Sequence, residues 1–137
     1  MPDLDAATRW LCDADPDQDH ARRWLATAKR TLLPLGRHWS AIRVADHEGL
    51  TAARTVTGPS IYDPAGRSVY FLVPVDTTWT APATELLGDT CYLTVPLPSV
   101  TEPPGPHWLR PPTGTGQLVD ADLLQTALGL GREGEDR

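Results

Sequence analysis

The chain has few cysteines, a single lysine and no long apolar run, and each shortage excludes a class of protein. Its two cysteines, Cys12 and Cys91, are too few for a disulfide framework or a cysteine-based zinc site, so we expect two reduced thiols. No apolar run approaches the length of about 18 residues that a membrane helix needs, and no basic stretch precedes an apolar one near the start. We therefore expect a soluble, cytoplasmic chain with no membrane contact.

Aromatic side chains other than tryptophan are also scarce, with one phenylalanine and three tyrosines against five tryptophans. Fourteen prolines and eleven glycines predict short elements joined by stiff loops. At 137 residues and 40% hydrophobic content, the chain is long enough to bury a core of its own. We expect one domain over residues 1–128 and a flexible tail over 129–137.

Positive charge is outnumbered, with 12 basic against 18 acidic residues and a formal net charge of −6. An acidic domain repels a phosphate backbone unless its cations gather on one face, so nucleic acid is a disfavoured partner. Two adjacent arginines at 22–23, with Lys29 and Arg30 nearby, form the only basic cluster, which we interpret as a solvated helix face. The alternative is contact with phosphate or with an acidic partner, for which the candidates are Arg22, Arg23, Arg43 and Arg67.

Hydrophobic spacing predicts four helices and five strands. The helices are expected over 3–12, 20–35, 47–56 and 120–130, with Asp3, Asp17 or Asp19, and Asp120 as N-caps. The strands are expected over 38–44, in a hairpin spanning 60–75, over 90–97, and over 106–111 as the antiparallel partner of 90–97. Because strands outnumber the helices between them, we expect an α+β fold. Its sheet is mixed or antiparallel, with helices packed mainly on one face.

Recurrent catalytic and metal motifs are missing from the sequence. There is no Gly-x-Ser-x-Gly, no Cys-x-x-Cys, no His-x-x-x-His and no glycine-rich loop opening a helix. The acidic stretch DADPDQDH at 13–20 lacks the glycine and the glutamate of a calcium-binding loop, so it predicts a polar turn that caps a helix. We predict no metal site and no cofactor.

The segment YLTVPLPSVTEPPGPHWLRPP at 92–112 is the most distinctive in the chain. An alternating strand enters a turn with Pro96, Pro98 and Ser99, bends at Gly105 and returns through Trp108. This order resembles bifunctional primase-polymerase domains of the archaeo-eukaryotic primase class. LLPLGRHWSAIRV and SVYFLVPVDTT upstream are similar to that family's tryptophan-bearing first strand and metal-binding strand. The resemblance covers roughly residues 20–112 and implies a primase-polymerase-like fold.

The resemblance also implies a nucleotide site that has lost its charged groups. The family's Asp-x-Asp pair, which holds divalent metal ions, reads Pro-Val-Asp at 74–76. Its Ser-x-His, whose histidine contacts phosphate, reads Ser-Val-Thr at 99–101. We therefore expect no catalytic residue and only a vestigial nucleotide-binding site made of Asp76, Ser99, Thr101 and His107.

These observations predict a non-catalytic primase-polymerase-like domain that binds or regulates another protein in the cytoplasm. One alternative is binding of a nucleotide or of single-stranded nucleic acid without catalysis. A second alternative is a small enzyme of unidentified chemistry that uses His38, His47 or His107.

Overall fold

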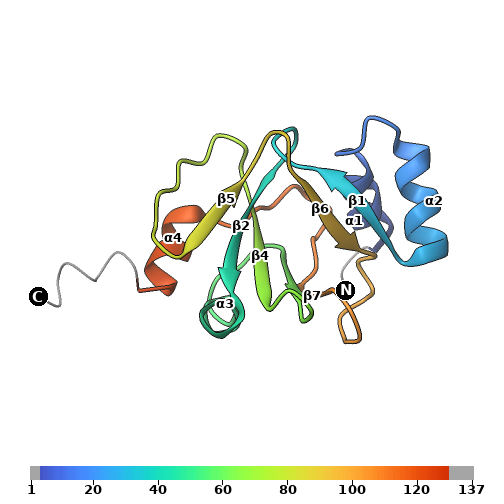
Figure 1. Cartoon of the computed structure of the whole chain (residues 1–137). Helices are drawn as coiled ribbons and strands as arrows, with labels where there is room; N and C mark the ends of the chain where they lie inside the picture. The colour runs from blue at the N-terminus through green and yellow to red at the C-terminus, as the bar shows by residue number, and fades with distance from the viewer. Residues whose placement is uncertain (1–3, 130–137) are drawn as a thin grey trace, which may run out of the picture.

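The computed structural model describes residues 4–129, which form an α+β fold. In Figure 1 helices lie at both ends of a set of strands that crosses the middle of the molecule, and also below it. The helices are α1 (Leu4–Cys12), α2 (Gln18–Ala28), α3 (Asp46–Ala53) and α4 (Ala121–Ala127). The strands are β1 (Arg30–Pro34), β2 (Ser40–Ala45), β3 (Ser60–Asp63), β4 (Ser68–Val73), β5 (Thr84–Leu87), β6 (Tyr92–Pro96) and β7 (His107–Arg110). The expected cap Asp3 and residues 130–137 of the expected tail lie outside the described residues.

The strands form two sheets in which every described pair is antiparallel. One sheet has five strands in the order β5-β2-β4-β3-β7, and the other consists of β1 and β6. The expected α+β class with an antiparallel sheet is thus confirmed. The predicted pairing of residues 90–97 with 106–111 is wrong, because β6 pairs with β1 and β7 pairs with β3. The long proline-rich connection at 97–106 allows β7 to reach a different sheet, and Trp108 N–H donates to the Val100 carbonyl at 2.9 Å.

The second helix ends seven residues earlier than its apolar spacing predicts. Lys29 takes a left-handed conformation with φ of 65°, and its N–H donates to the Leu25 carbonyl, which closes α2. The chain then reverses into β1, where burial alternates between exposed Leu32 and buried Leu33. Pairing with β6 overrides the helical period in this stretch. The strand β5 is a further element that the sequence did not predict.

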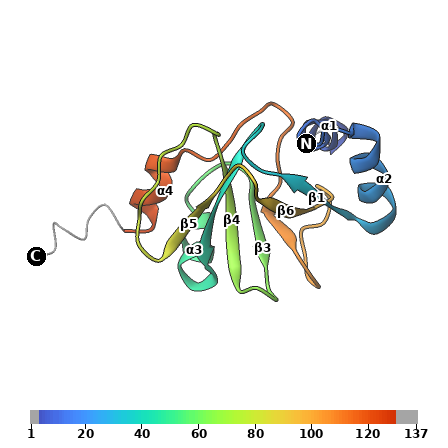
Figure 2. The same cartoon turned by 45° about the horizontal axis from the view of Figure 1, so that its top comes forward.

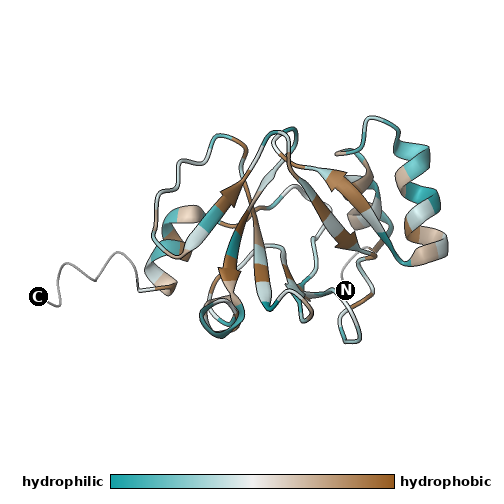
Figure 3. Ribbon diagram, viewed as in Figure 1, coloured by the Kyte–Doolittle hydropathy of each residue, from teal (hydrophilic) through white to brown (hydrophobic). Residues whose placement is uncertain are grey.

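Two hydrophobic clusters cover the two faces of the five-stranded sheet. Figure 2 shows α4 and α3 towards one side of the strands and α1 and α2 towards the other, and Figure 3 shows apolar residues recurring along the strands. Phe71 and Val69 of β4 face α3 and α4, while Leu72 of the same strand faces the opposite way. That opposite cluster includes β1, β6, α1 and α2, with Trp39 and Trp108 as its largest buried side chains. The expectation that the helices pack mainly on one face is therefore right for α3 and α4 and wrong for α1 and α2, since β4 is apolar on both faces.

Side-chain caps begin two of the helices as predicted. The Asp17 carboxylate accepts from the His20 N–H, and the Asp120 carboxylate accepts from the N–H groups of Asp122 and Leu123. An N-cap satisfies backbone donors that have no partner inside the helix. For α2 this places His20 and the residues that follow it at defined positions beside β1.

The two buried tryptophans provide a test of the packing, because only one of them has a partner for its indole N–H. Trp108 Nε1 donates to the Pro96 carbonyl at 2.8 Å, whereas Trp39 Nε1 has no hydrogen-bond partner among the described residues. We expect Trp108→Phe to lower the free energy of unfolding by about 1–3 kcal/mol more than Trp39→Phe, because it leaves a buried carbonyl unpaired. Urea denaturation of both variants measures the difference, and equal losses would contradict the packing.

Candidate functional site

The expected vestigial nucleotide site is split between the two ends of the five-stranded sheet. Asp76 is exposed and follows the end of β4, where Val73 pairs with Ser40. His107 begins β7 at the other end, where it pairs with Tyr62 and β4 starts. A strand of six residues separates these ends by about 20 Å. Asp76 and His107 therefore cannot contact one ligand phosphate together.

Ser99 and Thr101 lie in the loop after β6, on the same side as His107. Both are exposed, and the Val100 carbonyl between them accepts from Trp108 N–H. His107 is only 6% exposed, and its Nδ1 donates to the Gly105 carbonyl at 2.9 Å. Its ring also meets Tyr62 edge-on, with centroids 5.6 Å apart. The structure thus gives His107 a packing role at the loop base.

The four candidate arginines lie in two separate places. Arg43 pairs with Glu85 at 2.6 Å, and Arg67 lies 3.6 Å from Asp46, on the rim of one polar cavity of about 530 Å³. The pair at 22–23 is exposed on α2, which lies at one end of the molecule (Figure 1). These four arginines lie apart, and two of them are paired with acidic side chains. They therefore do not form the continuous basic surface that binds a phosphate backbone.

Arg22 also has a local partner, because it lies beside the buried thiol of Cys12. Burial raises the pKa of the Cys12 thiol above its ordinary value, and the Arg22 guanidinium opposes this by a charge interaction and a hydrogen bond. Asp13 and Asp15 add smaller increases. Burial is the larger effect, so Cys12 stays a protonated, unreactive thiol at neutral pH.

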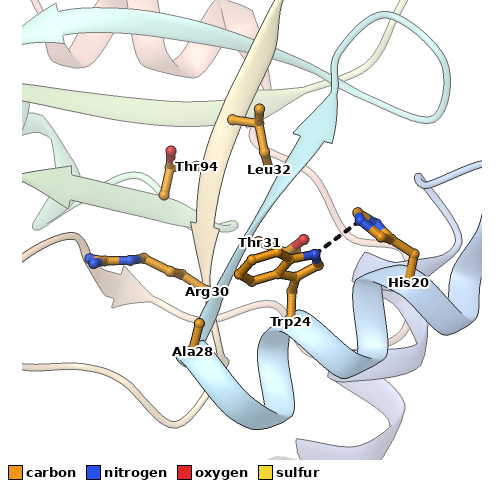
Figure 4. Close-up of a pocket in the computed structure, with 7 residues that line it drawn as sticks. All are labelled: His20, Trp24, Ala28, Arg30, Thr31, Leu32 and Thr94. Atoms are coloured by element: carbon orange, nitrogen blue, oxygen red, sulfur yellow. Dashed lines mark hydrogen bonds between the residues drawn. The ribbon is translucent and has the colours of Figure 1, made fainter.

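A mostly apolar groove of about 490 Å³ separates α2 from β1 (Figure 4). One side chain from each successive turn of α2 lines it, and three consecutive residues of β1 line the opposite wall. The lining residues are His20, Trp24 and Ala28 of α2, Arg30, Thr31 and Leu32 of β1, and Thr94 of β6. The spacing of four places the α2 residues on one side of the helix.

Hydrogen bonds hold the central tryptophan of this groove in place. Trp24 Nε1 donates to His20 Nε2 at 2.9 Å, and His20 Nδ1 lies 3.2 Å from Asp15 Oδ2. Since Nε2 accepts, the proton of the neutral imidazole lies on Nδ1 and faces the carboxylate. Trp24 is nevertheless 50% exposed. The ring is therefore oriented before any partner arrives, which lowers the entropy cost of binding.

Exposed apolar side chains extend the groove onto the outer face of the two-stranded sheet. Leu32 is 55% exposed and Tyr92 is 61% exposed, and both project from the face opposite to buried Leu33. Large apolar side chains grouped on a surface typically mark an interaction site. The helix predicted over 20–35 continues through Leu32 and therefore gives no sign of this surface. The signals that this prediction missed are the alternation over 30–34 and the four-residue spacing of His20 and Trp24.

Comparisons of the chain with protein-family models, with curated proteins and with solved structures give no match. Within residues 4–129, no helix is long and apolar enough to cross a membrane. The same residues contain no group of three or more acidic, histidine or cysteine side chains that could hold a metal ion. The geometry of the groove is therefore the observation from which a function can be argued.

The contact between Arg22 and Cys12 generates a prediction about thiol reactivity. Arg22→Ala removes a charge that stabilises the thiolate, so the Cys12 pKa should rise further. We expect alkylation of Cys12 by iodoacetamide to need a higher pH than in the wild type. Mass spectrometry of tryptic peptides across a pH series measures this. Arg23→Ala, on the next residue of α2, is the matched control and should leave the profile unchanged.

Proposed function

We propose that the protein is a non-catalytic module that binds another protein in the cytoplasm through the groove between α2 and β1. The observation that carries the proposal is the half-exposed pair Trp24 and Leu32 on the two walls of this groove. Tryptophan in a pocket is the residue type most often responsible for binding energy at protein interfaces. The protein thus offers an anchor and a cleft beside it.

The composition of the groove supports a protein ligand over a nucleic acid. Its walls are mostly aliphatic and aromatic, and the cations that border it, Lys29 and Arg30, lie at one end only. Two further exposed cations, Arg43 of β2 and Arg67 in the turn between β3 and β4, have acidic partners. A surface of this kind matches the apolar centre and polar rim of a protein interface.

The proposal retains a frame like that of primase-polymerase domains and excludes their chemistry. Two observations support the loss of that chemistry. The charged groups are replaced at 74–76 and 99–101, and Asp76 lies at the opposite end of the sheet from Ser99 and Thr101. A metal-dependent transfer of a nucleotide needs carboxylates and a phosphate contact that converge on one point. The protein would then act through its surface.

The proposal predicts which substitutions abolish partner capture. Trp24→Ala and Leu32→Ala should each reduce the recovery of a specific partner from native cell extract at least tenfold, because they remove the anchor and one groove wall. Leu123→Ala on α4 is the matched control, since Leu123 is 58% exposed and Leu32 is 55% exposed. Quantitative mass spectrometry of proteins retained by the tagged full chain compares the variants.

Two outcomes would contradict this function. Partners captured equally by the wild type and by Trp24→Ala would place recognition elsewhere on the surface. A rise in melting temperature with a nucleoside triphosphate and manganese would instead favour a nucleotide site, because a ligand that binds only the folded state stabilises it.

A further inference from the structure

Three residues of β1 line the groove, and the pairing register identifies which backbone groups of this strand point away from β6. Leu97 N–H donates to the Lys29 carbonyl, and Leu35 N–H donates to the Cys91 carbonyl. In an antiparallel ladder, hydrogen-bonded pairs alternate along the strand. Lys29, Thr31, Leu33 and Leu35 therefore direct their backbone groups towards β6.

The intervening residues of β1 direct their backbone groups the opposite way, away from β6. Arg30 and Leu32 each present one N–H and one C=O there, and the next such residue, Pro34, has only a C=O. β1 pairs with no other strand, and no backbone hydrogen bond joins Arg30 or Leu32 to another described residue on this side. Two donors and three acceptors are thus left open along this edge of β1.

We infer that an extended segment of a partner protein pairs with this edge of β1 and adds a third strand to the two-stranded sheet. The inference rests on the proposed function and names the kind of partner. Open N–H and C=O groups at strand spacing can form hydrogen bonds with an extended main chain. Such main-chain pairing is a common way for a peptide to add to a sheet edge. Side chains at alternate positions of that segment face the walls of the groove.

The walls of the groove specify the side chains of the segment. Trp24 and Leu32 form an apolar site for one large aliphatic or aromatic side chain. Thr31, a residue only 5% exposed, also lines the groove, and its buried hydroxyl has no hydrogen-bond partner among residues 4–129.

The charged residues at the two ends of the groove favour one direction for the bound segment. Lys29 and Arg30 lie at one end of the groove without an ion-pair partner in the described part of the chain. Asp15, Asp17 and Asp19 lie at the other end, around the start of α2. A segment with a carboxylate near Lys29 and its apolar side chain near Trp24 therefore complements the groove at both points.

Backbone-modified peptides test this pairing directly. A library of random ten-residue peptides displayed on phage is selected on the full chain, and the best binder is synthesised with an N-methyl group at each position in turn. Only alternate residues of an added strand donate to β1, so we expect affinity to fall about tenfold at every second position and little at the positions between. We also expect the selected peptides to combine an apolar residue with an acidic one.

Two variants of one residue provide the matched comparison on the protein side. Leu32→Ala and Leu32→Pro both remove the leucine side chain, but only the proline removes the open N–H, and neither removes a bond to β6. Leu32→Pro should bind the peptide about tenfold more weakly than Leu32→Ala, with both variants folded by circular dichroism. In the wild type, the peptide should slow hydrogen exchange at the Arg30 and Leu32 amides.

Several results would overturn the pairing. Equal effects of N-methylation along the peptide, or equal binding by the two Leu32 variants, would leave protein recognition through Trp24 standing and make strand addition wrong. A dimer in light scattering whose Arg30 and Leu32 amides are protected without peptide would assign the edge to a second copy of this chain. Failure of the library to give any binder that depends on Trp24 would overturn both the pairing and the proposed function.

Discussion

The reversal of the chain at Lys29 is the constraint on which the candidate site depends. A left-handed residue closes α2 and sends the chain back as β1, so helix and strand run side by side in opposite directions. Pairing with β6 then fixes which residues of β1 are buried and which backbone groups stay open. A helix continued to residue 35 would bury Leu32 and leave no groove beside Trp24. Lysine is not a usual left-handed residue, and two backbone hydrogen bonds hold it in this turn, from the Lys29 N–H to the Leu25 carbonyl and from the Leu97 N–H to the Lys29 carbonyl.

The fold was predictable where one element carries a strong local signal. The caps at Asp17 and Asp120, the hairpin of β3 and β4, and the strand ends near 92 and 110 all follow from turn residues and alternation over short stretches. The partners of the strands were not predictable in this way. Nothing local distinguishes β6 pairing with β7 from β6 pairing with β1, since the choice depends on how the 97–106 loop and the α2 reversal meet in space.

The candidate site was missed for the same physical reason. The run Thr31-Leu32-Leu33 is compatible with a strand, in which burial alternates, and with an amphipathic helix. In the helix predicted over 20–35, Leu32 would face inward. Trp24 is large and apolar, so the core is its default place, and only the bonds to His20 and Asp15 show that a half-exposed indole is held in position. The nucleotide site expected from the sequence included Asp76 and Ser99, which the register of β4 and the course of the 97–106 loop place apart.

Backbone pairing and the tryptophan contribute differently to recognition at this edge. An exchange of hydrogen bonds from water to a partner yields only about 1 kcal/mol for each bond, and Pro34 limits the open edge to two donors. The edge therefore determines the orientation and register of an added strand, while burial of apolar surface against Trp24 and Leu32 supplies most of the affinity. The short edge also resists unwanted pairing, because a strand that lacks a side chain for the groove gains too little from a few bonds to remain bound. Selectivity in such a module follows from the requirement that both features be met by the same segment.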